Sequence, residues 1–367
     1  MIYFDNSATT PPCPAAVKAA AEASFANPSS RHFMGVAAAK ELENARECVA
    51  DVLKIAPRDL YFTSGGTAAD NIAILGGADL HRGRRIVTTA VEHPAVLECV
   101  RELSARGFEV VHIPVNSTGD ITPEDIEAVL TPDTGLVSIM HVNNETGAIF
   151  PIDKIKPVMQ RICPDALLHT DAVQSFGKIA VHPEKCGVDM LSASAHKIHG
   201  IKGAGALYVR RGINLKTPVL GGGQESGIVS GTHNLPAIAA FAAATKEIDF
   251  GYENLPAKKL LAALSEIKGV TINRPQNALD SIINLSFGNI PSEVTLNALS
   301  AEGLCISAGS ACSSSKAGKS HVLRAMGAKN AAGAVRFSLS RYNTMEEVDE
   351  ALSIINKTIL PLMEALA

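Results

Sequence analysis

The residue of this sequence with the clearest capacity for covalent chemistry is a lysine at the end of an apolar run. Lys197 closes the segment Ser192-Ala193-Ser194-Ala195-His196-Lys197, which follows the strand-like run 188–191 and precedes a glycine-rich turn. Burial lowers the pKa of a lysine amine, and the neutral amine is a nucleophile. Ser194 and His196 could hold a phosphate beside it. A Schiff-base lysine next to a phosphate suggests pyridoxal phosphate (PLP), although a structural lysine or a surface loop would carry the same short motif.

A second candidate anion site is Ser64-Gly65-Gly66-Thr67, which joins a predicted strand to a predicted helix. Glycines there leave backbone N–H groups open at a helix N-terminus, where the helix dipole also attracts anions. The Thr67 hydroxyl could add a donor. An ordinary N-cap is the alternative interpretation. The Walker and GxGxxG spacings are absent, so a nucleotide-binding loop is not predicted.

Polar groups follow three further predicted strands. Asp171 could pair with a protonated pyridine nitrogen, and Gln174 could hydrogen-bond the phenolic oxygen of the ring. His93 could stack on the ring and exchange protons. The polar cluster 141–147 has buried amides that need partners, which a ligand could supply. Taken alone, Asp171 is equally a turn or cap residue, and His93 a capping or core histidine.

Two groups near the C-terminus suggest a reactive protein thiol and a binding site for a carboxylate. Cys312 lies in the small polar run 307–315, where an exposed thiol on a loop could visit a site; an incidental surface cysteine is the alternative. Arg336 lies in a predicted strand, and a partly buried guanidinium needs an anion such as an amino-acid carboxylate. The glycine-rich stretch 221–232 could reach a phosphate held by a partner subunit.

The elements that must position these groups alternate along the chain from residue 60. Strands are predicted at 60–63, 85–89, 109–114, 136–142, 166–170, 190–192 and 206–209. Helices are predicted between them at 68–75, 94–105, 123–130 and 153–162. Such alternation predicts an α/β fold with a mainly parallel sheet covered on both faces. Ligands of such sheets bind at the carboxyl ends of the strands, where most of the candidate groups lie.

The remaining elements predict a second, smaller α+β domain. Helices are predicted at 14–25, 36–53, 235–250, 256–268, 293–301, 322–326 and from 345 onward, and strands at 2–5, 270–273, 281–287, 305–307 and 335–339. The length of 367 residues suits two closely associated domains. We predict a large PLP-binding domain at 15–253 and a small domain formed by 1–14 and 254–367.

Composition excludes several classes of protein. The net charge is only −4 without a basic block, so direct nucleic-acid binding is not predicted. The N-terminus has no signal-peptide pattern and no apolar run is long enough to span a membrane, so no membrane association is expected. Seven scattered cysteines without metal-ligand spacing predict reduced thiols in a cytoplasmic protein, and no resident metal site.

Together, these motifs resemble those of cysteine desulfurases of the NifS/IscS-like group, which are PLP enzymes of the class V aminotransferase family. The resemblance runs essentially end to end. Its motifs are 3–10 (YFDNSATT), 27–30 (NPSS), 63–67 (TSGGT), Glu92-His93, 141–145 (HVNNE), 171–174 (DAVQ), 194–197 (SAHK), 221–225 (GGGQE), 309–312 (GSAC) and 336–339 (RFSL). It implies fold type I of PLP-dependent transferases, with a large mainly parallel mixed sheet and a smaller C-terminal domain.

The resemblance also implies a role for each candidate residue. Lys197 would bind the cofactor covalently, His93 would stack on the ring and shuttle protons, and Cys312 would carry a persulfide. Arg336 and Asn144 would bind the substrate. The implied cofactor-binding set is Gly66, Thr67, Asn144, Asp171, Gln174, Ser194, His196, Lys197 and, from the neighbouring subunit of a homodimer, Thr232.

The implied reaction converts L-cysteine to L-alanine and leaves the sulfur as a persulfide on Cys312. The acceptor would be an iron–sulfur scaffold or a tRNA-thiolation protein, and Cys312 could serve as a transient iron–sulfur ligand. The alternative is a related class V lyase, acting on selenocysteine, cystine or cysteine without an obligatory persulfide. Val229 departs from the pattern, because the family commonly has an arginine there; Gly66 and Ala68 replace a usual alanine and glutamate.

Overall fold

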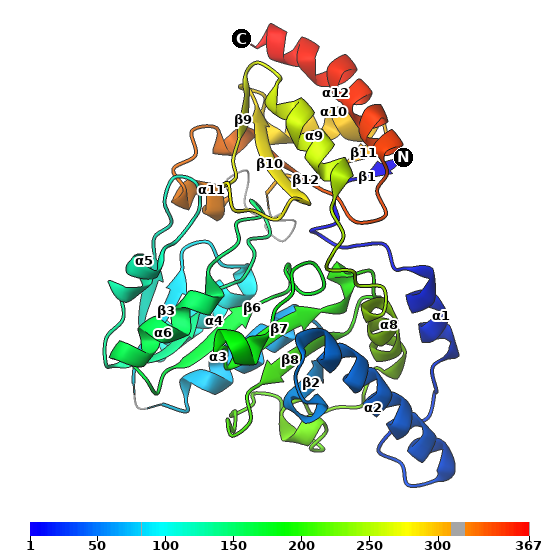
Figure 1. Cartoon of the computed structure of the whole chain (residues 1–367), viewed down its shortest axis with the longest axis vertical. Coiled ribbons are helices and arrows are strands. Elements are labelled where there is room, and N and C mark those ends of the chain that lie inside the picture. Colours follow the sequence, from blue (N-terminus) through cyan, green and yellow to red (C-terminus); the bar gives the residue numbers. More distant parts are fainter. Residues whose placement is uncertain (82, 310–319, 367) are drawn as a thin grey trace.

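The computed structural model describes residues 1–81, 83–309 and 320–366 (Figure 1). The largest sheet of these residues has the strand order β2-β8-β7-β6-β5-β3-β4. Its strands are β2 (Leu60–Thr63), β3 (Arg85–Thr89), β4 (Glu109–Ile113), β5 (Thr134–Ser138), β6 (Leu167–Asp171), β7 (Met190–Ser194) and β8 (Gly205–Val209). Strand β8 is antiparallel to β2 and β7, and the other pairs are parallel. The predicted α/β class with a mainly parallel mixed sheet is confirmed.

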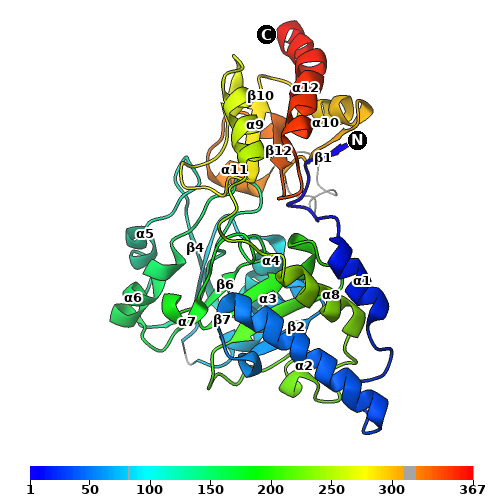
Figure 2. The same ribbon diagram turned by 45° about the vertical axis from the view of Figure 1, so that its right-hand side comes forward.

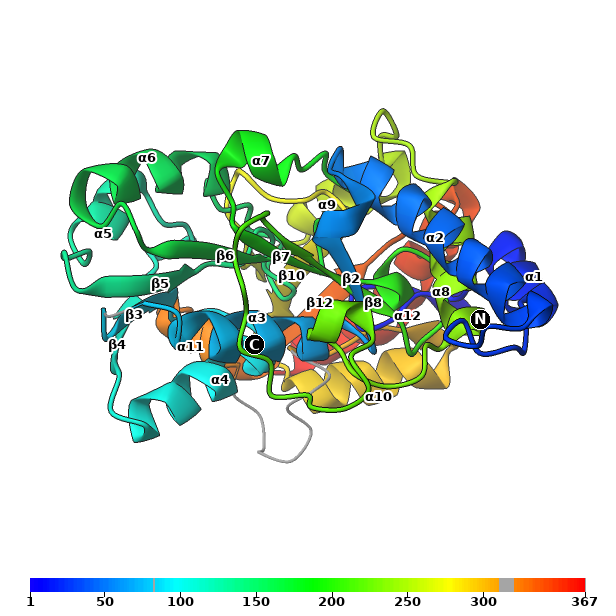
Figure 3. The same cartoon turned by 90° about the horizontal axis from the view of Figure 1, so that it is seen from below.

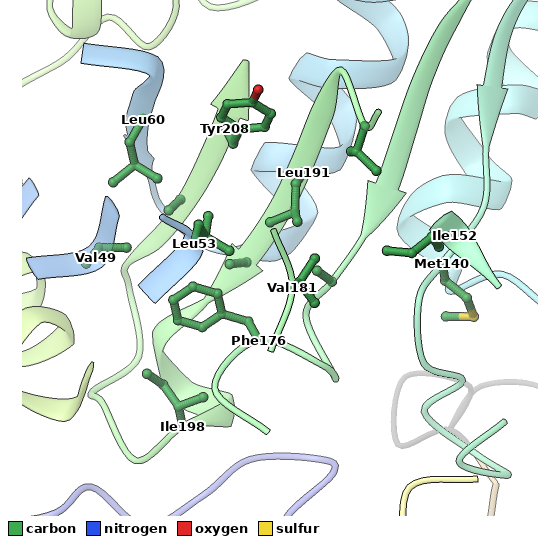
Figure 4. Close-up of a cluster of buried hydrophobic side chains, with 14 of the residues drawn as sticks. Val49, Leu53, Leu60, Met140, Ile152, Phe176, Val181, Leu191, Ile198 and Tyr208 are labelled. Atoms are coloured by element: carbon green, nitrogen blue, oxygen red, sulfur yellow. The ribbon is translucent and has the colours of Figure 1, made fainter. Parts of the chain in front are cut away.

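Helices cover both faces of this sheet (Figure 3). On one side lie α3 (Gly66–Ala78) and α4 (Pro94–Ala105); on the other lie α2 (Phe33–Leu53), α6 (Ile152–Ile162) and α7 (Pro183–Cys186). Consecutive strand residues enter different cores: Leu136 packs in the α3–α4 cluster and Val137 in the opposite one. Figure 4 shows part of this second cluster around Leu191. Because helices cover both faces, β5, β6, β7 and β8 are buried at every position, and the polar residues of β6 and β7 are buried with them.

The other helices of this part pack around its edges. They are α1 (Pro14–Glu22), α5 (Pro123–Glu127) and α8 (Leu235–Thr245). Helix α8 packs against α1 and α2, and α5 packs against α6. Among the described residues, no helix is both long and apolar enough to cross a membrane.

The last third of the chain forms a separate sheet with its own helices (Figure 2). Strand β10 (Ile282–Phe287) lies between β9 (Val270–Ile272) and β12 (Ala334–Ser338), antiparallel to both. The helices are α9 (Leu255–Ser265), α10 (Ser292–Ala301), α11 (His321–Ala325) and α12 (Met345–Ala365). The N-terminal strand β1 (Ile2–Tyr3) pairs in parallel with β11 (Leu304–Cys305), which brings the first residues to this sheet. The domain limits at 14/15 and 253/254 stay a prediction.

Several predicted elements are longer than those observed. The strand predicted at 136–142 ends at Ser138, and Ile139, Met140 and Val142 are buried in irregular chain instead. The helix predicted at 235–250 ends at Thr245, whose hydroxyl donates to the Ala242 carbonyl and competes with the helical ladder. Helix α7 is not predicted. Buried apolar residues alone do not distinguish a strand from a packed loop.

Candidate active site

The polar groups that follow the parallel strands meet at one cavity of about 380 Å³. It lies where β3, β5, β6 and β7 end, as the strand order requires. Among the described residues, the cavity is lined by every predicted site residue except Thr232, namely Gly66, Thr67, His93, Asn144, Asp171, Gln174, Ser194, His196, Lys197 and Arg336. The structure therefore brings these groups together, and their individual roles stay predictions.

One end of the cavity is suited to an anion. Helix α3 starts there, and its N-cap Gly65 has no side chain to satisfy the first amides. The Ser194 hydroxyl is buried and has no hydrogen-bond partner in the described part of the chain. A Cβ on Gly66 would stand 2.5 Å from Cγ2 of Val173, so Val173 fills the space that a larger residue at 66 would need. The uncapped helix start and the unpartnered hydroxyl are donors suited to an anion, and phosphate binding here stays a prediction.

Lys197 is half-buried at the end of a single 3-10 turn that follows β7. Its Nζ donates to the backbone oxygens of Ser7 (2.5 Å) and Ala8 (2.8 Å). The N-terminal segment therefore crosses the cavity and holds the amine from 190 residues away. No role for Ser7 or Ala8 is predicted from the sequence, although the polar run after the first strand is a signal for one.

Two histidines of the cavity are neutral at physiological pH. Burial, with Lys197 and His321 nearby, lowers the pKa of His93 to about 4. Burial, with Lys197, Lys202 and Lys178, lowers the pKa of His196 to about 4 as well. His93 Nδ1 accepts from the Ala95 amide and caps α4, so the capping role and the position in the cavity coexist. Each imidazole is therefore uncharged in the cofactor-free cavity.

Asp171 lies at the end of β6 with only 4% of its surface exposed. Its Oδ1 accepts from the Val173 amide at 2.8 Å. Burial raises the pKa of Asp171 to about 6, although that amide and the Lys197 ammonium act in the opposite direction. A cationic partner in the cavity would lower this pKa and keep the carboxylate ionised to lower pH.

Asp70 on α3 is a second buried carboxyl that lines this cavity. No role for it is predicted from the sequence, because an aspartate in a helix is usually exposed. One of its oxygens, Oδ1, has no partner in the described residues, and burial followed by repulsion from Asp171 raises its pKa. His169 Nε2 lies 3.6 Å from that oxygen, but burial lowers the pKa of His169 to about 3, so this contact is no ion pair at neutral pH.

The three side-chain amides predicted near the cavity differ in their hydrogen bonds. The side chain of Asn143 is hydrogen-bonded within the protein: its Oδ1 accepts from the Glu145 and Thr146 amides, and its Nδ2 donates to the Val91 carbonyl. The expectation that the whole 141–147 cluster awaits a ligand is therefore wrong for Asn143, and Asn144 is the one that lines the cavity. Gln174 donates from Nε2 to the Ser7 carbonyl at 2.9 Å and accepts at Oε1 from Lys178.

Arg336 lies on β12 with 1% of its side chain exposed and reaches the cavity from the second sheet. Its Nη1 donates to the Asn144 carbonyl (2.8 Å) and its Nη2 to Asp5 Oδ1 (2.9 Å). Its Nε is buried without a partner among the described residues. The sequence predicted that this guanidinium needs an anion, but did not predict that Asp5 supplies one.

Cys312 lies outside the described residues. The described residues on either side of its segment, Gly309 and Ser320, both lie at Glu145: a Cβ on Gly309 would stand 3.6 Å from Glu145 Oε2, and the Ser320 hydroxyl donates to the same oxygen. Glu145 follows Asn144 of the cavity wall. These described ends therefore adjoin the cavity.

Thr232 is exposed and lies outside the cavity of its own chain. Its loop is fixed by Glu225, which accepts from both terminal nitrogens of Arg46 (2.6 and 2.8 Å) and contacts His233 at 2.7 Å. Burial acts to raise the pKa of Glu225, but the hydrogen bonds from His233 and Arg46 outweigh it and hold the pKa at about 2.

Val229 packs at the edge of the α3–α4 cluster, an apolar environment unsuited to an arginine.

Comparison with known proteins gives a consistent result. Residues 2–351 match the family described as Aminotransferase class-V. A cysteine desulfurase of Nostoc sp. is 40% identical over 379 residues, which cover 98% of this chain and 93% of the relative. A solved NifS-like protein superposes with a TM-score of 0.88 at 38% identity, covering 97% of this chain and 98% of the other. A structure of SspA in complex with cysteine has a TM-score of 0.83 at 33% identity, covering 94% and 100%.

Proposed function

From the premise that this chain belongs to the class V aminotransferase family, we propose that it converts L-cysteine to L-alanine and transfers the sulfur through Cys312. The protein is a PLP-dependent cysteine desulfurase with the type I fold of PLP enzymes. The observation that carries the assignment of roles is the convergence of Lys197, Asp171 and an open anion cradle on one cavity. The lyase alternative is not favoured, because the Nostoc relative is a cysteine desulfurase and one of the two solved structures is a NifS-like protein.

The chemistry of the cavity fits PLP. The uncapped start of α3 and the unpartnered Ser194 hydroxyl would bind the phosphate, together with Thr67 and His196. Asp171 would face the pyridine nitrogen and Gln174 the phenolic oxygen. When bound, PLP supplies an aldehyde that bonds to amines and a ring that withdraws electrons from them.

Lys197 is the residue of this chain that would hold the cofactor covalently and later remove the proton from Cα of the substrate. The Ser7 and Ala8 carbonyls fix its Nζ in the cavity, so the amine starts from a defined position. His93, neutral because burial lowers its pKa to about 4, would accept and return protons on the ring side of the site. Arg336 would bind the substrate carboxylate with the help of Asn144.

In the sulfur-transfer step, the Cys312 thiolate would attack the sulfur of the substrate. The new S–S bond forms as the Cβ–S bond breaks, and its electron pair remains on the carbon fragment, which is protonated to alanine. The adjacency of Gly309 and Ser320 to the cavity wall supports this assignment. The persulfide would then pass to an acceptor such as an iron–sulfur scaffold or a tRNA-thiolation protein.

We further propose a homodimer in which the partner subunit's Thr232 completes the phosphate cradle. The exposure of Thr232 and the ion pair that holds its loop support this arrangement, because the residue does not line the cavity of its own chain.

The cysteines support a reducing compartment such as the cytoplasm. All those described are free thiols, namely Cys13, Cys48, Cys99, Cys163, Cys186 and Cys305.

The experiment that tests this function is product analysis. PLP-loaded protein incubated with L-cysteine and a thiol reductant is expected to form alanine and sulfide in equal amounts. A cysteine or cystine lyase that works by β-elimination would instead form pyruvate and ammonia. Pyruvate as the main carbon product, from cysteine or cystine, would contradict the desulfurase assignment.

Affinity for PLP is expected to depend on the charge of Asp171. Because its carboxyl has a pKa of about 6, raised from 3.8 mainly by burial, cofactor-free protein holds it ionised above pH 6 and protonated below. PLP affinity should therefore fall as pH drops through about 6, and Asp171→Asn should weaken PLP binding roughly tenfold or more at pH 8. Titration of the apoprotein with PLP measures both effects. A low-pH decline that persists unchanged in Asp171→Asn would contradict this assignment.

A further inference from the structure

Asp5 belongs to the N-terminal segment that crosses the cavity, and it is bound to the arginine that faces the substrate. Its Oδ1 accepts from Arg336 Nη2 at 2.9 Å, while the Asn144 carbonyl accepts from Nη1 at 2.8 Å. Arg336 is 1% exposed and Asp5 20%. Two anchors from distant parts of the chain therefore fix both terminal nitrogens of one guanidinium.

These anchors leave part of the guanidinium available. Of its five N–H donors, the two contacts consume one on each terminal nitrogen. The Nε donor is buried and has no acceptor in the described chain. Buried N–H groups are normally satisfied, and a carboxylate takes two neighbouring donors of a guanidinium at once. A ligand carboxylate in the cavity is the acceptor that this geometry lacks.

We infer that Asp5 is a positioning residue for substrate binding, whose carboxylate fixes Arg336 so that its remaining N–H donors meet the carboxylate of the substrate. This inference rests on the proposed function, in which Arg336 binds that carboxylate. A long side chain loses less conformational entropy on binding when it is already held in its bound orientation. Asp5 therefore favours binding even though it adds a negative charge beside the site.

The position of Asp5 does not depend on its side chain. The Ser7 amide donates to the Ser338 hydroxyl at 2.8 Å, and the Asn6 amide donates to the Ser338 carbonyl at 3.1 Å. The Phe4 amide donates to the Cys305 carbonyl at 2.9 Å. Because backbone contacts hold the segment on both sides, Asp5→Ala removes the carboxylate and leaves the path of the chain intact.

The test compares two probes on the PLP-loaded enzyme, L-alanine and L-alaninamide, titrated by the absorbance of the cofactor. Both carry the amine and methyl group, but only L-alanine carries a carboxylate. The wild-type enzyme should prefer L-alanine, and Asp5→Ala should lower that preference roughly tenfold. Asp5→Asn keeps an acceptor oxygen and should lower it less. The KM for L-cysteine should rise in parallel, with kcat within about threefold.

The matched control is Asp349→Ala, which breaks the exposed ion pair with Lys259 and should change neither probe. An unchanged or increased preference in Asp5→Ala would overturn the inference, an increase meaning that Asp5 competes with the substrate. If Asp5→Ala fails to fold, Asp5→Asn gives the same comparison. Arg336→Lys distinguishes failure of the proposed function from failure of the inference. If Arg336→Lys keeps the preference for L-alanine, the proposed role of Arg336 is refuted. If Arg336→Lys loses this preference and Asp5→Ala keeps it, only the inference about Asp5 is refuted.

Discussion

Lys197→Ala is expected to abolish cysteine desulfurase activity, with kcat/KM falling roughly 10⁴-fold or more. The substitution removes both the amine that would hold PLP and the base that would take the Cα proton. Its Nζ is fixed by the Ser7 and Ala8 carbonyls, and Lys178 and Lys202, the nearby lysines, lack these two contacts. We therefore expect neither Lys178 nor Lys202 to take over the function of Lys197.

The measurement for this variant has two parts, alanine formation from L-cysteine and the visible absorbance of the purified protein. Both should be lost in Lys197→Ala. Lys202→Ala is the matched control, because Lys202 lines the same cavity and has no proposed contact with the cofactor; it should keep the absorbance. Substantial turnover by Lys197→Ala, in the absence of added amines, would contradict the role of this lysine.

Cys312→Ala is expected to abolish formation of alanine and sulfide while leaving PLP bound. The physical reason is that Cys312 would supply the nucleophile for the sulfur atom, whereas the groups of this chain proposed to hold the cofactor lie at the start of α3 and at or after the ends of β5, β6 and β7. Loss of a covalent nucleophile removes the pathway itself, so a decrease of at least about 10³-fold in kcat is expected.

The matched control for Cys312→Ala is Cys305→Ala, since Cys305 is a free thiol on β11 outside the cavity. It should keep normal turnover. Mass spectrometry of wild-type protein after a single turnover should show one additional sulfur on the peptide that contains Cys312. Sulfide release that survives in Cys312→Ala would show that the persulfide is not obligatory and would favour the lyase.

Much of the fold could be predicted because its signals are local. Strand β3 and helix α4 have the bounds predicted from sequence, since Pro94 and the capping His93 mark the start of the helix and the strand is an apolar run between turns. The parallel sheet follows from alternation of such elements. Residues that follow its strands, including Asp171 and Lys197, could then be assigned to one edge.

The parts that sequence did not predict depend on contacts between distant segments. Lys197 meets Ser7 across 190 positions and Arg336 meets Asp5 across 331, and no local pattern indicates which segment will cross the cavity. Asp70 occupies a helix position that looks solvent-exposed, but α3 is covered by the sheet on one side and by α4 on another. Burial of that carboxyl is a consequence of packing in three dimensions.

The most direct test of the account is to identify the lysine that binds PLP. Borohydride reduction of the PLP-loaded protein, followed by proteolysis and mass spectrometry, fixes the cofactor to its lysine. Lys178 is the strongest competitor, because burial, with Lys197 and Arg336 nearby, lowers the pKa of its amine to about 7. We predict a phosphopyridoxyl group on the peptide that contains Lys197. The same group on Lys178 or Lys202, or on no lysine, would contradict it.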